Sequence, residues 1–273
     1  MTDTATEAPE SGGASDYLFD NHSEHAFDQH RFLAAAYDPM TTERLAETGV
    51  GPGWRCLEVG AGGGSVARWL AERVAPGGSV LATDIKPERI PAAEGLEVRR
   101  HDIVRDPLPE AAYDLVHARL VLLHLPERIA VLERLVRALK PGGVLQLDEF
   151  DIGYGPALLM PDPRARRLYE EFLEAKIRVM SGAGADPAWG RNAPEAMRRA
   201  GLVEVDPRPR VELWDASSPG VHLIAHHTRH LRDAFLRAGM TDQRLAEVRE
   251  LLADPAFRAC SCLIYSIQGR RPR

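Results

Sequence analysis

Residues 58–65 read Glu58-Val59-Gly60-Ala61-Gly62-Gly63-Gly64-Ser65, and the fold follows from them. The segment comes directly after a short apolar run and directly before a segment with helical spacing. Glycine lets the backbone turn tightly and approach a ligand closely, and the N–H groups at a helix start can hold a polar or anionic group. The turn is therefore a candidate ligand loop. The alternative is a strand-to-helix turn that needs glycine for its geometry alone.

Outward from this turn, short apolar runs alternate with helical patterns between Arg55 and Phe150. Short runs bounded by Gly, Pro or Asp are typical of buried parallel strands. Strands are predicted at 56–59, 80–83, 96–99, 115–118 and 144–147. One helix is predicted around Val66, Leu70 and Val74, and another opens at Pro126 and stops at Pro141-Gly142-Gly143. Repeated strand–helix units predict an α/β fold with a doubly wound sheet.

After Asp151 the pattern becomes mainly helical. A long amphipathic helix is predicted over 168–179 and a short one over 192–201, strand character returns over 203–214, helical patterns follow over 221–253, and a strand closes over 260–268. The extra helices form two insertions, which we expect to cap the carboxyl ends of the strands, where open α/β folds bind ligands. The expected divisions are a disordered tail (1–16), a helical lid (17–50), a ligand-binding core (51–150), a helical insertion (151–202) and a last part (203–273) whose own insertion spans about 215–255.

Composition limits the function classes. The chain has 273 residues, 44% of them hydrophobic and 27% charged, and a net charge of -6. This composition is typical of a globular protein with a full core. An acidic balance without clustered cations argues against general affinity for nucleic acid or anionic membranes. No run of about 18 apolar residues occurs, which argues against a membrane span.

The cysteines and the first residues predict a cytoplasmic location. Cys56, Cys260 and Cys262 form neither an even framework nor a C-x-x-C pair, which favours a reducing compartment and no structural zinc. Residues 1–16 carry acidic side chains, no basic one and no apolar run, unlike a secretory signal or a transit peptide.

Two ligand classes compete for the glycine turn. A dinucleotide site favours G-x-G-x-x-G/A, and counting from Gly60 puts Ser65 at the third small position, so the match is partial. The same residues match fully the E/D-x-G-x-G-x-G signature of the class I S-adenosylmethionine-dependent methyltransferases, with Glu58 as the leading acid. The chain resembles this family from about Tyr17 to Gln268.

Further motifs carry the resemblance. Asp84 ends the second strand, Arg100-His101-Asp102-Ile103 follows the third, and 113–119 and 139–143 resemble the fourth strand and the turn into the fifth. The resemblance implies a Rossmann-like, seven-stranded sheet with the last strand antiparallel, and S-adenosyl-L-methionine as cofactor. It implies that Asp84 accepts the ribose hydroxyls, Asp102 accepts from the adenine amino group and Ile103 packs on the ring. The implied cofactor-binding residues are Glu58, Gly60, Ala61, Gly62, Gly63, Asp84, Ile85, Asp102, Ile103 and Arg119. Asp84 as a helix cap and Asp102 as a turn residue are the plainer alternatives.

The segment before the sheet resembles the lid helix of small-molecule methyltransferases of bacterial secondary metabolism. It holds Tyr17-Leu18-Phe19-Asp20-Asn21, His25, His30 and Arg31. Arg31 is a candidate partner of the donor's carboxylate. Ordinary core packing of the aromatic residues is the alternative.

Methyl transfer from a sulfonium is an in-line displacement, so the protein chiefly aligns the acceptor and excludes water. An acceptor that must lose a proton also needs a base. The candidates are His124, Glu149, Asp151 and His226, the last from a face that also carries His222 and His230. A solvated acidic loop at 149–151, a structural His124 and a merely polar helix face are the alternatives.

No metal is expected. Two histidines at i and i+4 can bind zinc, but no nearby Cys or Glu completes a ligand set. The catechol-type members of the family hold magnesium with carboxylates after the fourth strand, where this chain has Arg119.

These features predict an enzyme that methylates an O, N or C atom of a small organic molecule without a metal, and a homodimer is plausible through its apolar helices. Three alternatives stay open. They are a nucleic-acid or protein methyltransferase, an NAD(P)-dependent oxidoreductase, and a non-catalytic module that binds S-adenosylmethionine.

Overall fold

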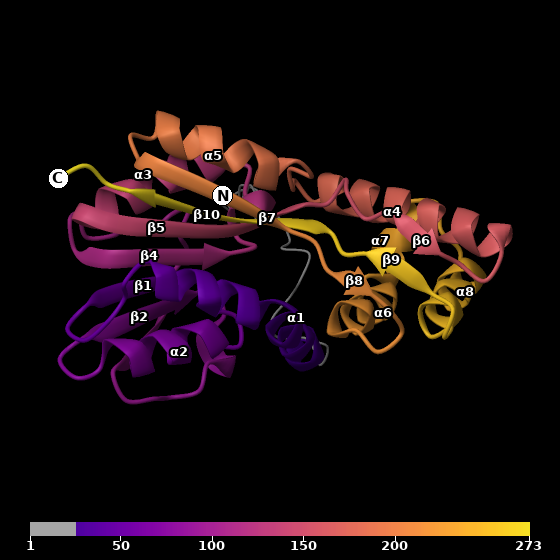
Figure 1. Ribbon diagram of the computed structural model, residues 1–273, viewed down its shortest axis with the longest axis horizontal. Helices are drawn as coiled ribbons and strands as arrows, with labels where there is room; N and C mark the ends of the chain where they lie inside the picture. Colours follow the sequence, from indigo (N-terminus) through magenta and orange to yellow (C-terminus); the bar gives the residue numbers. More distant parts are fainter. Residues whose placement is uncertain (1–25) are drawn as a thin grey trace, which may run out of the picture.

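The computed structural model describes residues 26–273. The predicted tail, the 17–21 motif and His25 lie outside these residues. A seven-stranded sheet forms the centre, in the order β3-β2-β1-β4-β5-β10-β7 (Figure 1). The strands are β1 (Arg55–Val59), β2 (Ser79–Asp84), β3 (Leu96–Arg100), β4 (Tyr113–Arg119), β5 (Leu139–Asp151), β7 (Val203–Arg210) and β10 (Leu263–Arg270).

The strand directions confirm the predicted doubly wound sheet with an antiparallel last strand. β10 pairs antiparallel with both β5 and β7, and the pairs among β1 to β5 are parallel. The chain order reverses between β1 and β4, which places a switch point at their carboxyl ends.

Both faces of the sheet are covered, which explains the continuous apolar runs in its strands. Side chains alternate, so that Cys56 packs in the cluster around α2 (Ser65–Val74) while the neighbouring Leu57 packs in the larger cluster on the other face. That larger cluster includes α3 (Arg128–Ala138) and α5 (Trp189–Arg199).

β5 is much longer than the predicted strand at 144–147. It begins at Leu139, and its pairing with β4 shifts register between Tyr113 and Leu115. The Pro141-Gly142-Gly143 segment is thus an irregularity inside the strand, directly after α3 ends. At the other end, pairing with β10 extends β5 to Asp151. Glu149 and Asp151 therefore belong to a strand and not to a solvated loop.

A cap lies beyond the carboxyl ends of the parallel strands (Figure 1). Its helices are α4 (Pro163–Gly182), α6 (Pro219–His230), α7 (Arg232–Arg237) and α8 (Asp242–Leu252), and its small sheet has the order β6 (Ala157–Leu159), β9 (Arg258–Cys260), β8 (Leu213–Trp214). The predicted strands 203–214 and 260–268 are each split, because the chain passes from the main sheet into the small one.

The expectation that every inserted helix belongs to the cap is wrong for α5, which packs on the main sheet. Gly190 lies against the backbone of β5, where a Cβ would meet the Glu149 carbonyl oxygen at 2.6 Å. Ala193 and Met197 are fully buried there. The small residue lets the helix approach the strand closely.

The helix α1 (Ala26–Glu47) runs between the main sheet and the cap and packs against α6. Its Phe32 ring meets the His222 ring edge-on at 5.7 Å. None of the described helices is both long and apolar enough to cross a membrane.

Candidate active site

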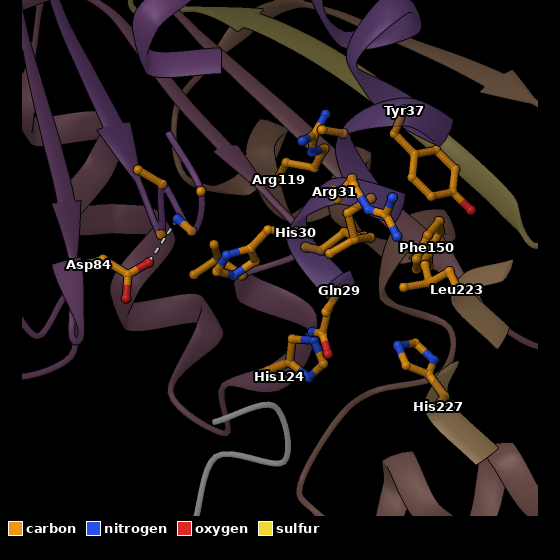
Figure 2. A pocket seen from close by; sticks show the side chains of 18 of the residues that line it. Gln29, His30, Arg31, Tyr37, Asp84, Arg119, His124, Phe150, Leu223 and His227 are labelled. Atoms are coloured by element: carbon orange, nitrogen blue, oxygen red, sulfur yellow. Dashed lines mark hydrogen bonds between the residues drawn. The ribbon is translucent and has the colours of Figure 1, made fainter. Parts of the chain in front are cut away.

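A cavity of about 660 Å³ lies where the main sheet, α1 and the cap meet. The glycine turn, the end of β2 and the segment after β3 line one half of it, whereas α4, α6 and α7 line the other. Figure 2 shows Asp84 on one side and Phe150, Leu223 and His227 on the other, with side chains of α1 between them. One continuous cavity thus joins the predicted cofactor residues to the cap.

The position of the glycine turn is fixed by contacts with β2 and α1. The Gly62 N–H donates to Oδ2 of Asp84 at 2.9 Å, drawn as a dashed line in Figure 2. A Cβ on Gly63 would lie 3.1 Å from Cβ of His30, so α1 packs directly on the turn. The helix α2 begins at Ser65 without a side-chain cap, which leaves N–H groups at its start available to a ligand.

Two carboxylates at this end are fixed by hydrogen bonds from the backbone. Oδ1 of Asp84 accepts from Lys86 N–H at 2.9 Å, and Oδ1 of Asp102 accepts from Val104 N–H at 2.9 Å. Both carboxylates line the cavity together with Ile85 and Ile103. Two acceptors, two apolar side chains and an exposed backbone turn suit a nucleoside with an adjoining polar chain, so these residues fit the predicted cofactor.

Nine of the ten predicted cofactor residues line the cavity: Gly60, Ala61, Gly62, Gly63, Asp84, Ile85, Asp102, Ile103 and Arg119. Glu58 is the exception. It is buried inside β1, and its Oε2 lies 2.6 Å from Nδ1 of His117. The alternation of β1 turns this side chain away from the turn that follows the strand.

A buried polar network lies under the turn. Nε2 of His117 is 3.2 Å from Oδ2 of Asp148, which also accepts from the Thr41 hydroxyl at 2.6 Å. Burial alone would lower the pKa of His117, but the charges of Glu58 and Asp148 and the hydrogen bonds to them raise it to about 9. An imidazolium between two carboxylates therefore links β1, β4 and β5, and Thr41 attaches α1 to them.

Arg119 makes a second attachment of α1. Its guanidinium donates to Asp38 at 2.8 Å and to the Thr41 hydroxyl at 3.1 Å. Nearer the start of α1, burial lowers the pKa of His30, and the charge of the Asp84 carboxylate partly opposes this lowering. Arg31 also lines the cavity, where it forms an ion pair with Asp28 at 2.9 Å.

The half of the cavity inside the cap is mainly apolar. The rings of Phe172 and Phe235 stack at 5.3 Å, and Phe150 meets Tyr37 edge-on at 5.2 Å. This half of the cavity is also lined by four polar side chains, those of His124, Lys176, His227 and Cys262. The ammonium of Lys176 donates to Sγ of Cys262 at 3.2 Å.

Of the four predicted catalytic residues, His124 alone lines the cavity. Burial and the charge of Arg128 lower the pKa of His124 to about 4, so the imidazole is neutral at neutral pH. A neutral imidazole can accept a proton.

Glu149 and Asp151 are directed away from the cavity. Oε1 of Glu149 accepts from Leu122 N–H at 2.9 Å, and burial raises the pKa of Glu149 to about 8 against the opposing backbone hydrogen bonds. Oδ1 of Asp151 accepts from Nη2 of Arg191 at 2.6 Å. Alternation instead directs Phe150 to the cavity. These carboxyl groups support the segment after β4 and the start of α5.

His226 is also outside the cavity lining, and its neighbour His227 takes that place. His226 stacks on His230 at 5.9 Å and meets Phe32 edge-on at 6.2 Å, so it packs between α6 and α1. Burial, followed by the charges of Lys176 and the neighbouring histidines, holds the pKa of His227 well below its usual range. Side chains of adjacent residues in a helix point about 100° apart, so the four-residue spacing of the histidines does not decide whether His226 or His227 faces the cavity.

Sequence reasoning missed Lys176 and Tyr37. Lys176 carried a usable signal, because it lies on the same face of its helix as Phe172 and Val179. A lysine in such an apolar stripe faces either the core or a cavity. Tyr37 carried none, since nothing distinguishes it from an ordinary core residue.

Within 26–273 no group of three or more His, Cys, Asp or Glu side chains is arranged to hold a metal ion. The three cysteines are free thiols.

Known proteins that are similar to this chain include several methyltransferases. Residues 57–145 match the methyltransferase domain family. The chain is 36% identical over 210 residues to methyltransferase str2 of Strobilurus tenacellus, over 75% of this chain and 74% of that protein. It is 32% identical over 246 residues to nocamycin O-methyltransferase of Saccharothrix syringae, over 84% and 75% of the two chains.

Solved structures share the fold. The phosphoethanolamine N-methyltransferase 2 of Haemonchus contortus, in complex with S-adenosyl-L-methionine, superposes with a TM-score of 0.58 and 14% identity, covering 97% of this chain and 62% of that one. The YcgJ protein of Bacillus gives a TM-score of 0.57 at 15% identity, with 86% and 99% coverage.

Proposed function

Because the chain belongs to the class I S-adenosylmethionine-dependent methyltransferases, we propose that it methylates a small organic acceptor held in its cap, without a metal ion. The cofactor is S-adenosyl-L-methionine, which supplies a methyl group made electrophilic by the sulfonium. One observation carries the proposal of a small acceptor. The cavity that contains Asp84 and the glycine turn continues into a mainly apolar chamber lined by residues of the insertions.

The donor is proposed to bind along the sheet edge. Asp84 is placed to accept the ribose hydroxyls and Asp102 to accept from the adenine amino group, while Ile85 and Ile103 contact the base. The glycine turn and the start of α2 hold the amino-acid end. The helix α1, through His30 and Arg31, closes this end as the proposed lid, and Arg119 anchors that helix.

The chain's contribution to chemistry is mainly positional. The apolar walls exclude water and hold the acceptor in line with the methyl group, which can supply several kcal/mol of the barrier reduction. Where the acceptor must lose a proton, the neutral imidazoles of His124 and His227 can take it. Glu149, Asp151 and His226 act as supports of these groups rather than through contact with the acceptor.

Absence of a metal is supported by the side chains present. The end of β4 offers Arg119, already paired with Asp38, where a magnesium site requires oxygen ligands. The free thiols favour a cytoplasmic enzyme. Its acidic balance favours a small molecule over nucleic acid. A homodimer through cap or α1 helices is part of the same proposal.

The test is transfer of labelled methyl groups from S-adenosyl-L-methionine to a library of small acceptors, run beside bulk RNA and protein. We expect labelled products from the library alone. Labelling of RNA or protein would contradict the small acceptor. If neither the donor nor S-adenosylhomocysteine gave a calorimetric or melting-temperature response, the proposed donor site would be wrong.

A further inference from the structure

We propose that the acceptor is a largely apolar molecule with one anionic oxygen group, and that Lys176 binds this group. A carboxylate and an acidic phenol or enol share this chemistry. The inference rests on the proposed function, because it concerns the acceptor half of the same cavity. It adds a substrate class and a specificity residue.

The first observation is where Lys176 lies. It belongs to α4, on the face that carries Phe172, Ala175 and Val179, all of them buried. Lys176 is itself partly buried and lines the cavity. Lysine is rarely placed on an apolar face without a partner for its charge. Its position thus calls for a counter-charge.

The protein itself does not supply that counter-charge within the described residues. The hydrogen-bond partner of Lys176 is the Cys262 thiol, at 3.2 Å, and no Asp or Glu between 26 and 273 forms an ion pair with it. Arg119 offers a contrast, since its guanidinium is matched by Asp38 at 2.8 Å. Lys176 is thus a cavity cation whose neighbours leave room for an anion.

The acidic side chains around the cavity lie at one end, while arginine side chains, Arg31 and Arg119 among them, also line it. Its acidic lining residues, within the described part of the chain, are Asp84 and Asp102, and both lie at the donor end. The other end has Lys176, His124 and His227. Burial contributes most to the lowered pKa of His227, and the charge of Lys176 contributes next. Lys176 therefore lies close enough to His227 to act on its imidazole. An anion is therefore favoured at the cap end and a cation is disfavoured.

The walls limit the rest of the acceptor. Phe172, Phe235, Leu223 and Trp214 surround the polar cluster with apolar surface. A single ammonium matches a singly charged oxygen group better than a phosphate, which usually takes several donors. The cavity thus fits an apolar body with one weakly acidic group.

The test compares acids with their neutral methyl derivatives by titration calorimetry, in the presence and absence of S-adenosylhomocysteine. The probes are naphthoate and cinnamate with their methyl esters, and para-nitrophenol with para-nitroanisole. We expect at least one acid to bind the native chain about tenfold or more tightly than its neutral partner. Lys176→Met should abolish that preference and leave binding of the neutral partner within about twofold. Lys176→Arg, which keeps the charge, should retain the preference.

Arg167→Met is the matched control. It removes another cation from the same helix, but Arg167 is exposed and does not line the cavity, so the preference should persist. If the native chain prefers the acid over its neutral derivative only for the carboxylates, or only for the phenol, that result identifies which anion the site binds. The proposal is overturned if no acid binds more tightly than its neutral partner, or if Lys176→Met weakens acid and neutral probe equally. If the native chain failed to bind S-adenosylhomocysteine, the proposed donor site would be contradicted instead. The titrations without S-adenosylhomocysteine test the role of Lys176 independently of that site.

Discussion

Asp84 combines two tasks at the residue scale. Its two carboxylate oxygens accept from the N–H groups of Gly62 and Lys86, which fixes the glycine turn relative to β2. A carboxylate oxygen has room for a further donor, so the same side chain can accept a ribose hydroxyl. The geometry of the turn and the proposed ribose contact therefore depend on one carboxylate.

Asp84→Asn should weaken binding of S-adenosylhomocysteine by about 2 to 4 kcal/mol, because an amide N–H would replace one of the two acceptors. Titration calorimetry measures the loss. Glu97→Gln, an exposed change on β3, is the control and should leave the affinity unchanged. Unchanged binding in Asp84→Asn would remove Asp84 from the donor site.

At the element scale, α1 depends on polar contacts with the sheet. Thr41 is fully buried, donates to Asp148 at 2.6 Å and accepts from Arg119 at 3.1 Å. These contacts attach the helix beside the cavity that it lines. The neighbouring Thr42 hydroxyl bonds within α1, to the Asp38 carbonyl at 2.8 Å.

Thr41→Val should destabilise the chain by about 1 to 3 kcal/mol, since it leaves the buried Asp148 and the partly buried Arg119 without the hydroxyl. Thr42→Val removes the same atoms one position along and should cost less than about 1 kcal/mol. Urea unfolding of both variants measures the difference. Equal losses would show that the attachment of α1 does not depend on the Thr41 hydroxyl.

At the scale of the whole molecule, two buried groups make stability depend on pH in the same direction. The pKa of His117 is raised from 6.5 to about 9, so its stabilising contribution is complete below pH 6.5 and is lost as the pH rises to 9. The pKa of Glu149 is raised from 4.5 to about 8, so the fold favours its protonated form and loses stability as the pH rises through that range.

The melting temperature should therefore fall as the pH rises from 6.5 to 9. Glu149→Gln, which is neutral at every pH, should reduce the fall below pH 8. His117→Gln should be destabilised by about 3 to 5 kcal/mol at pH 7, because it leaves two carboxylates without their cation, and should reduce the fall between pH 6.5 and 9. Thermal unfolding across this range checks both variants. A rising melting temperature in the native chain would refute the assignment of both protonation states.

The alternation of apolar runs and helical patterns was enough to predict the sheet, because strands that are buried on both faces appear in the sequence as continuous apolar runs. Element ends were less predictable. The length of β5 follows from pairing with β10, more than a hundred residues later in the chain. In the same way α5 joins the main sheet because Gly190 fits against β5, a contact that no local pattern reveals.

The amino-acid sequence by itself determined which residues form the proposed donor end of the cavity. Gly60, Asp84, Asp102 and Arg119 each lie at or just beyond the end of a strand, and the carboxyl ends of parallel strands meet at one edge, so strand order alone brings them together. The lining of the proposed acceptor end was decided by tertiary structure. Lys176, His227 and Cys262 come from separate elements, and packing of the cap, rather than spacing along the chain, chooses which side chains enter the cavity and which, like His226 and Glu149, turn away.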